Sequence, residues 1–241
     1  MSPRVFLTAE WRDLALLTFA ADQSVLIPHL PPGLELDLWD GRAFASLVGF
    51  QFLHTSVLGV PAWPWRDFPE VNLRFYVRRR AREGPRRGVV FVKEIVPHRM
   101  VAWIARTLYG ENYVSLPMRT TFQTGRRAEY SWQHAGAENR FSVMASDQPF
   151  YPQPGSIEDF ILDHHWGYSR SRRGECVEYF VDRPAWRIFP VTGHTIRIDT
   201  ERAYGTPFAR ALDAQPISAI LAEGSPISVS FGRTVTGSPS D

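Results

Sequence analysis

The chain has 241 residues, enough for one large domain or two small ones, and 44% of them are hydrophobic. Its formal net charge of +2 excludes a strong overall field that would attract nucleic acid or an anionic membrane. The single cysteine, Cys176, excludes an internal disulfide and a cysteine-based metal cluster. No apolar run approaches the roughly 20 residues that span a bilayer, and the N-terminus lacks a segment of signal-peptide type. We therefore expect a cytoplasmic protein.

The N-terminal part of the chain predicts one strand or helix, followed by a short helix. The apolar run within residues 6–20 is too short to distinguish a strand from a helix. Asp22 is a candidate N-cap for a short helix that ends before Pro31-Pro32-Gly33.

The next segment has the pattern of a β-hairpin. Residues 34–38 alternate between leucine and acidic side chains, Asp40-Gly41 follows, and residues 42–52 are apolar and aromatic. Asp-Gly between two such runs is typical of a two-residue hairpin turn, because both central positions need positive φ. Residues 54–69 contain several Pro and Trp, which predicts a long irregular loop that serves as a lid or a cavity wall.

A second hairpin is predicted at the centre of the chain. Residues 70–78 alternate between polar and apolar, which predicts a strand with one polar face. The polar side chains of this strand are Glu70, Asn72, Arg74, Tyr76 and Arg78. A basic loop over residues 79–87 leads to a second strand over residues 89–96, which is apolar enough to be covered on both faces.

Two neighbouring charged residues, Lys93 and Glu94, lie near the end of that second strand. Successive side chains on a strand point to opposite faces, so one of the two must face the interior. Lys93 is the only lysine in the chain. Burial would lower its pKa and free its amine for Schiff-base chemistry. The alternative is a lysine at a strand end that extends to solvent or pairs with an acid.

The remainder of the chain predicts short elements. Apolar spacing indicates a helix over residues 101–108, a capping box at Ser156 predicts a helix from Ile157 to about His165, and Thr206-Pro207 begins a last helix. Strands are predicted over residues 115–123, 128–134, 141–145, 176–181, 195–198 and 227–231.

These elements predict a β-rich α+β fold: a single antiparallel β-barrel or strongly curled sheet with three or four peripheral helices. We expect one domain over residues 1–233 and a disordered tail over residues 234–241, which is rich in Gly, Ser and Pro.

Several strings resemble the YqjF-like family of uncharacterised bacterial proteins, over about residues 7–231. They are Thr8–Leu14, Leu30–Asp37, Gly41–Ala43, Leu47–Phe50, Phe68–Arg78 and Gly88–Pro97. The family's layout is similar to that of the acetoacetate-decarboxylase-like superfamily. The resemblance implies a closed or cone-shaped antiparallel β-barrel with an internal cavity and helices packed outside.

The chain departs from that superfamily at its reactive residues. Acetoacetate decarboxylases act through a Schiff-base lysine beside a second lysine, a few residues after a glutamate that resembles Glu94. Here the corresponding stretch is His98-Arg99-Met100-Val101, which contains no lysine. We therefore do not expect decarboxylation by the superfamily's mechanism.

The polar row of the central hairpin is the candidate site. If Arg74 lies across from Glu94, Arg74 can bind a substrate carboxylate and a desolvated Glu94 can act as a general base. Glu70, Asn72 and Tyr76 are the candidate ligand-binding residues, and Lys93 is a minor catalytic alternative. The competing interpretation is an ordinary sheet whose polar row faces water and holds a structural ion pair.

Two other patterns predict ordinary surface roles. Asp163-His164-His165 suggests a metal site, but adjacent histidines on a helix diverge by about 100°. We expect neither a metal nor a cofactor. Six arginines within residues 78–87 suggest nucleic acid, but we expect a solvated hairpin tip.

The sequence thus predicts a protein that binds a small organic carboxylate or carbonyl compound in a barrel cavity, with acid–base chemistry of the lyase type at Glu94 and Arg74. The alternative is a non-catalytic ligand-binding or interaction protein. Assembly into a homo-oligomer is a further expectation, whereas a membrane partner is not expected.

Overall fold

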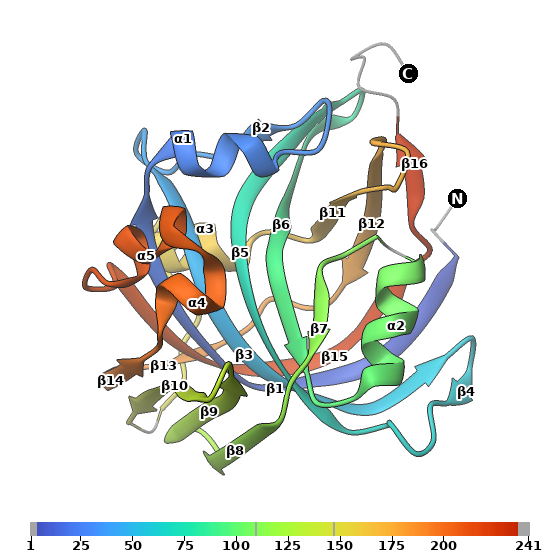
Figure 1. Ribbon diagram of the computed structural model, residues 1–241. Coiled ribbons are helices and arrows are strands. Elements are labelled where there is room, and N and C mark those ends of the chain that lie inside the picture. Colours follow the sequence, from blue (N-terminus) through green and yellow to red (C-terminus); the bar gives the residue numbers. More distant parts are fainter. Residues whose placement is uncertain (1–3, 109, 147, 236–241) are drawn as a thin grey trace.

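The computed structural model describes residues 4–235 apart from 109 and 147 (Figure 1). Its main feature is a ring of seven strands within a 12-stranded sheet. Each strand pairs with the next, and β12 also pairs with β15 through Val181–Val229 and Asp182–Ser228, which closes the ring. In spatial order the strands are β1 (Val5–Ala21), β3 (Ala43–Val57), β5 (Phe68–Ala81), β6 (Gly84–Val96), β11 (Trp166–Arg170), β12 (Cys176–Asp182) and β15 (Ser218–Ser230).

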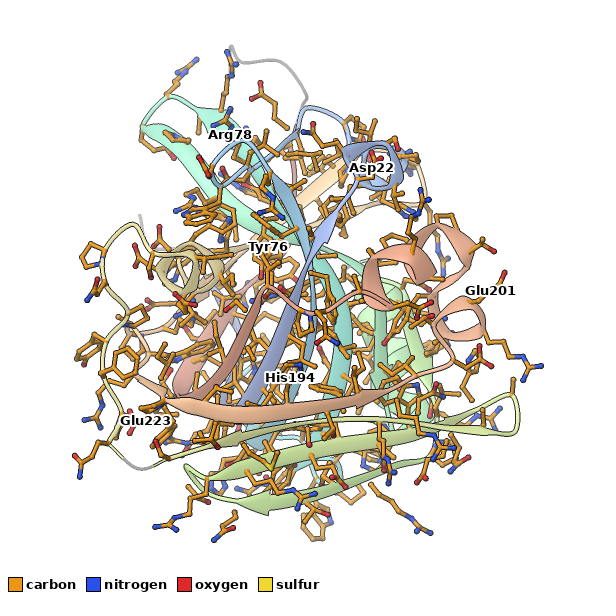
Figure 2. All side chains as sticks on the ribbon, turned by 90° about the vertical axis from the view of Figure 1, so that its left-hand side faces the viewer. Asp22, Tyr76, Arg78, His194, Glu201 and Glu223 are labelled. Carbon is orange, nitrogen blue, oxygen red and sulfur yellow. The ribbon has the colours of Figure 1, made fainter. Side chains whose placement is uncertain are left out.

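Short strands and a second sheet complete the β structure. The short strands that pair with members of the ring are β2 (Glu35–Leu36), β4 (Val60–Pro61), β7 (Tyr113–Ser115), β13 (Ile188–Phe189) and β16 (Arg233–Val235). The second sheet consists of β14 (Val191–Arg197), β10 (Ala137–Ala145), β9 (Arg127–His134) and β8 (Met118–Gln123). In the view of Figure 2 this sheet lies beneath the ring. The prediction of a β-rich chain is confirmed.

Two apolar cores lie on the two faces of the ring strands. One contains Leu17, Leu47, Leu73 and Phe75, and it packs against residues of the second sheet such as Tyr130. The other contains residues of every ring strand except β11, with Phe160 and Trp186 from the connecting segments. Strand β6 contributes to both cores, which confirms that it is covered on both faces.

Five α-helices and one 3-10 helix lie around the sheets in the described part of the chain. They are α1 (Gln23–Leu26), η1 (Ile27–His29), α2 (Arg99–Leu108), α3 (Ile157–Leu162), α4 (Thr200–Tyr204) and α5 (Thr206–Leu212). The sequence predicts three or four helices, so this number is too low: it misses the short helix α4.

The predicted caps Asp22 and Ser156 both accept a backbone N–H, whereas the N-cap of α5 is Gly205 and not Thr206. No described helix has the length and apolar character needed to cross a membrane.

The Asp40-Gly41 turn is confirmed, but the hairpin predicted around it is wrong. Asp40 and Gly41 both have positive φ, and Trp39 and Arg42 bond to each other across the turn. The strand before the turn, β2, pairs with β5 and not with β3. A strand has only two edges, and β3 already pairs with β1 and β5 along most of its length.

Two further predictions need correction. The loop expected over residues 54–69 is strand at both ends and contains β4. The apolar run of residues 6–20, which the sequence left open as a strand or a helix, is part of the 17-residue strand β1. The disordered tail expected from residue 234 is wrong for Thr234 and Val235, because these residues pair with β12. The rest of that tail, residues 236–241, lies outside the described residues.

The arginine-rich tip of the central hairpin is built of strand, so the loop predicted over residues 79–87 is wrong, although part of the tip is exposed to solvent as predicted. Strands β5 and β6 run up to a two-residue turn at Arg82-Glu83. Arg78 and Arg80 pair with Glu35, and Arg87 pairs with Asp37 and Asp163.

Glu178 on β12 holds this tip against the rest of the ring. Its side chain is fully buried and accepts hydrogen bonds from Arg79 at 2.9 Å, Arg86 at 2.5 Å and Arg233 at 2.5 Å. A buried carboxylate with three cationic partners joins β5, β6, β12 and β16 at one point.

We predict that Glu178→Gln lowers the free energy of unfolding by about 3–5 kcal/mol, because it leaves the largely buried Arg79 guanidinium without a counter-charge and removes one from Arg86. Urea denaturation at neutral pH measures this change. Glu35→Gln is the matched control, since its arginine partners are exposed and such pairs contribute about 0–1 kcal/mol. Equal losses in the two variants would contradict the role given to Glu178.

Candidate functional site

A cavity of about 190 Å³ lies within the ring, and each of the seven ring strands contributes to its wall. Much of the wall is aromatic. The Trp11 ring lies 5.0 Å from Phe50 and 6.1 Å from Trp186, and Phe52 stacks on Phe68 at 4.8 Å. This part of the cavity suits an apolar group.

The polar row predicted on β5 faces this cavity for most of its length. Glu70, Asn72 and Arg74 all line the wall. Tyr76 is not among the lining residues: its hydroxyl lies 2.5 Å from Ser46 Oγ in the core. Figure 2 shows Tyr76 in the interior and Arg78 near the tip of the hairpin.

A β-bulge at Val92 decides which residues of β6 join that row. Arg74 pairs with Phe91 and Leu73 pairs with Lys93, so Val92 is an extra residue without a partner on β5. The extra residue reverses the alternation. As a result Phe91 and Glu94 both face the cavity, although they are three positions apart. The expected Arg74–Glu94 pairing is therefore wrong: Glu94 lies opposite Asn72.

Lys93 points away from the cavity. It is half-buried on the other face of β6, where its ammonium donates to the Ala203 carbonyl and lies 5.6 Å from the centre of the Tyr204 ring. Burial lowers its pKa. Lys93 is the only lysine of the sequence, so no lysine lines the cavity that holds Glu94.

Three buried glutamates meet inside the cavity. Glu70 accepts hydrogen bonds from Tyr113 at 2.8 Å and from the Asn72 amide at 2.9 Å. Glu111 accepts from Tyr179. Glu94 lies beside Tyr113 in the parallel pairing of β6 with β7, and its Oε2 is buried without a hydrogen-bond partner in the described part of the chain.

The tyrosine that reaches Glu111 depends on a glycine. A Cβ on Gly167 of β11 would lie 2.1 Å from the Tyr179 ring, so only glycine leaves room for that ring. Because Gly167 has no side chain, the Tyr179 ring can lie over this position of β11 and donate to Glu111.

Burial raises the pKa of all three carboxyl groups and so favours their neutral forms. Burial raises the pKa of Glu70 to about 7 and that of Glu111 to about 8. Burial also raises the pKa of Glu94 well above its usual value, and the negative charges of Glu111 and Glu70 raise it further. Three carboxyl groups at such close quarters cannot all ionise. Glu94 therefore presents a neutral carboxylic acid to the cavity.

Arginines supply positive charge to the same cavity. Arg74 and Arg183 both line it, and the Nε of Arg74 is buried without a hydrogen-bond partner among the described residues. Burial and the neighbouring charge of Arg74 together lower the pKa of Arg183 to about 9. Repulsion between two guanidinium groups favours an anion between or beside them.

His164 also lines the cavity and is held by a carboxylate. Its Nε2 lies 3.1 Å from Asp37 Oδ2, which also accepts from Arg87 at 2.7 Å. Burial lowers the pKa of His164 to about 4. The described residues include no group of three His, Cys, Asp or Glu side chains that could hold a metal ion. Within the Asp163-His164-His165 pattern, Asp163 pairs with Arg87 and His165 lies against the Val181 carbonyl, so only His164 contacts Asp37.

Alternation along one strand identified Glu70, Asn72 and Arg74, but it could not find the residues contributed by distant segments. Those residues are Glu111, Tyr113, His164, Tyr179 and Arg183. They reach the cavity through the parallel pairings of β7 and β11 with β6 and through closure of the ring at β12. No local pattern signals such pairings.

Comparisons with known proteins identify the family of this chain and solved structures with a similar fold. The family model DUF2071, described as an uncharacterized conserved protein, matches residues 8–226. The uncharacterized protein YqjF of Bacillus subtilis (strain 168) is 31% identical over 166 residues, which is 67% of this chain and 66% of YqjF, just under two thirds of the relative.

Solved structures with the same fold are acetoacetate-decarboxylase-like proteins. An acetoacetate decarboxylase from Legionella pneumophila has a TM-score of 0.68 at 10% identity, over 97% of this chain and 88% of its own. An acetoacetate decarboxylase-like enzyme from Sphingomonas wittichii RW1 has a TM-score of 0.65 at 14% identity, over 95% and 92%. The enduracididine biosynthesis enzyme MppR, in complex with pyruvate, has a TM-score of 0.62 at 14% identity, over 100% and 93%.

We predict that the buried carboxyl groups make the fold less stable as pH rises. A carboxyl group whose pKa is raised by folding contributes stability below its unfolded pKa of 4.5, and that contribution is lost as pH rises toward about 7 for Glu70 and about 8 for Glu111. Glu111→Gln should therefore flatten the fall in unfolding free energy across this window, as measured by urea denaturation at a series of pH values. The surface control Glu223→Gln should keep the parent profile. Parallel profiles for Glu111→Gln and the parent would show that Glu111 titrates normally.

Proposed function

The chain belongs to the uncharacterized family DUF2071, and we propose that it binds a small organic acid with a carbonyl group in the cavity of its ring. The observation that supports this most is the buried, unpartnered Nε of Arg74 in the cavity that also holds Glu94, whose neutral form burial favours. Arg74 supplies charge and a donor for the carboxylate of the ligand. The protonated Glu94 donates a hydrogen bond to its carbonyl oxygen. In this proposal the ring is a β-barrel that encloses the site.

Acid–base chemistry follows from the unequal carboxyl groups. The pKa of Glu94 is raised well above its usual value by burial and by the neighbouring glutamates, so in this proposal it acts as the acid and polarises the carbonyl, in contrast to the general-base role expected from the sequence. Glu70, with a pKa of about 7, is the group with the value suited to accept a proton near neutral pH. Together they support removal of a proton from the carbon next to the carbonyl. The electron pair of the broken C–H bond then forms an enol, whose oxygen takes the proton of Glu94.

This chemistry does not use an amine nucleophile. Lys93 lies on the far face of β6, so its amine cannot attack a carbonyl bound beside Glu94. The pyruvate bound by MppR, a protein of the same fold, makes a 2-keto acid the first ligand to test.

The second candidate is a non-catalytic ligand-binding protein. The aromatic wall around Trp11 and Phe50 favours it, because such a surface holds apolar cargo without chemistry. Exchange of the ligand's α-hydrogens for deuterium separates the two: the catalytic protein speeds this exchange and the carrier does not.

Other expectations remain predictions. We propose a location in the cytoplasm and assembly into homo-oligomers, with no membrane partner and no nucleic-acid partner. The ion pairs at the hairpin tip leave less free positive charge there for nucleic acid than the six arginines suggest.

We predict that Arg74→Gln weakens binding of pyruvate and phenylpyruvate by about 10- to 100-fold, because a hydrogen bond to a charged group contributes about 1.5–3 kcal/mol. Isothermal titration calorimetry measures both affinities. Arg78→Gln changes the same residue type on the same strand outside the cavity, so its affinities should match those of the parent. Undiminished binding by Arg74→Gln would overturn the proposed anion site.

Glu94→Gln tests the acid role separately. The amide keeps the size of the side chain but has no proton to give, so we expect binding to persist while deuterium exchange of the pyruvate methyl group falls to the uncatalysed rate. Proton NMR in deuterium oxide follows that exchange. Exchange at the parent rate would remove Glu94 from the mechanism, and no acceleration by the parent protein would favour the carrier.

A further inference from the structure

His164 carries a buried polar atom that the proposed carboxylate and carbonyl contacts leave without a partner. Its side chain is fully buried, and its Nδ1 has no hydrogen-bond partner among the described residues. A buried polar atom without a partner costs about 1–3 kcal/mol, so such atoms in a cavity mark positions where a ligand or water bonds.

The contact with Asp37 fixes which hydrogen bond Nδ1 can make. Hydrogen bonds from His164 and Arg87 keep the pKa of Asp37 below its usual value in spite of burial, so its carboxylate only accepts. His164 is neutral and carries a single ring proton, which must lie on Nε2 to donate to Asp37. Nδ1 is therefore a bare acceptor, and its partner must be a donor.

Arg74 and His164 are neighbours in the cavity. The Arg74 guanidinium lies 5.8 Å from the centre of the Tyr76 ring, and the His164 ring lies 4.8 Å from the same ring. Both residues line the cavity. A ligand with its carboxylate at Arg74 can therefore extend an adjacent substituent along this wall toward His164.

We propose that the natural ligand carries a hydroxyl group on the carbon next to its carboxylate, and that His164, positioned by Asp37, selects it by accepting the hydroxyl hydrogen at Nδ1. This rests on the proposed function, which supplies the carboxylate at Arg74. A 2-hydroxy acid with an apolar body fits both ends of the cavity, since the aromatic wall at Trp11 and Phe50 receives the body. The enol of a 2-keto acid has its hydroxyl at the same carbon and satisfies the same acceptor.

Matched pairs of acids test the role of the hydroxyl group. Lactate is compared with propionate, and 3-phenyllactate with 3-phenylpropionate, by calorimetry. We expect the parent protein to bind each hydroxy acid about tenfold more tightly than its partner, because only the hydroxyl satisfies Nδ1.

His164→Phe is the central variant. Phenylalanine keeps a ring against Tyr76 and Phe160 and removes the acceptor. We expect it to abolish the preference for the hydroxy acids while the affinities for propionate and 3-phenylpropionate stay within about threefold of the parent. His194→Phe, on β14 and outside the cavity, should keep the full preference.

Asp37→Asn tests the positioning role. It removes the carboxylate that holds the ring proton on Nε2, so the preference should fall without a matching loss for propionate. This variant also reports on the proposal if His164→Phe does not fold.

The outcomes separate this inference from the proposed function. Equal binding of the paired acids by the parent, or an unchanged preference in His164→Phe, overturns the inference and leaves the carboxylate site in place. Failure of all four acids and both keto acids to bind the parent overturns the proposed function itself, and this inference with it.

Discussion

The bulge at Val92 is the local feature on which the candidate site depends. In an unbroken strand Phe91 and Lys93 would face the same side, and the cavity would contain an amine. The extra residue reverses that order, so Glu94 enters the cavity opposite Asn72 and Lys93 faces Ala203 and Tyr204. One unpaired residue therefore changes the available chemistry from a nucleophilic amine to a neutral carboxylic acid.

The other residues of the cavity favour a neutral carboxylic acid at Glu94. Without a cation directly beside it, Glu94 remains protonated, and its glutamate neighbours reinforce this state. The positive charges of Arg74 and Arg183 gather farther along the same wall, where they lack a full complement of acidic partners. The outer tip shows the opposite arrangement, because Glu178 lies between three arginines and joins four strands. The fold thus separates a structural charge cluster from a cavity whose polar atoms are left for a ligand.

Sequence patterns predicted the part of the site that lies on one regular strand. Alternation in residues 70–78 placed Glu70, Asn72 and Arg74 on one face, and the structure brings all three to the cavity wall. Tyr76 follows the same alternation and packs on that side of the sheet, but its hydroxyl bonds to Ser46 and it does not line the cavity. A bulge has no signature in a run of apolar residues, so the pairing of Arg74 with Phe91 could not be foreseen. Glu111 and His164 depend on long-range strand pairing, which no local pattern encodes.

Carbon-13 NMR titration of the glutamate side chains tests the central claim most directly. In protein labelled at the glutamate carboxyl carbons, with Glu94→Gln used to assign its signal, the Glu94 carboxyl should stay protonated at about pH 7. Glu70 and Glu111 should titrate near 7 and 8. An ionised Glu94 with a pKa near the ordinary 4.5 would show that the carboxyl group faces water, and it would contradict the account of this site.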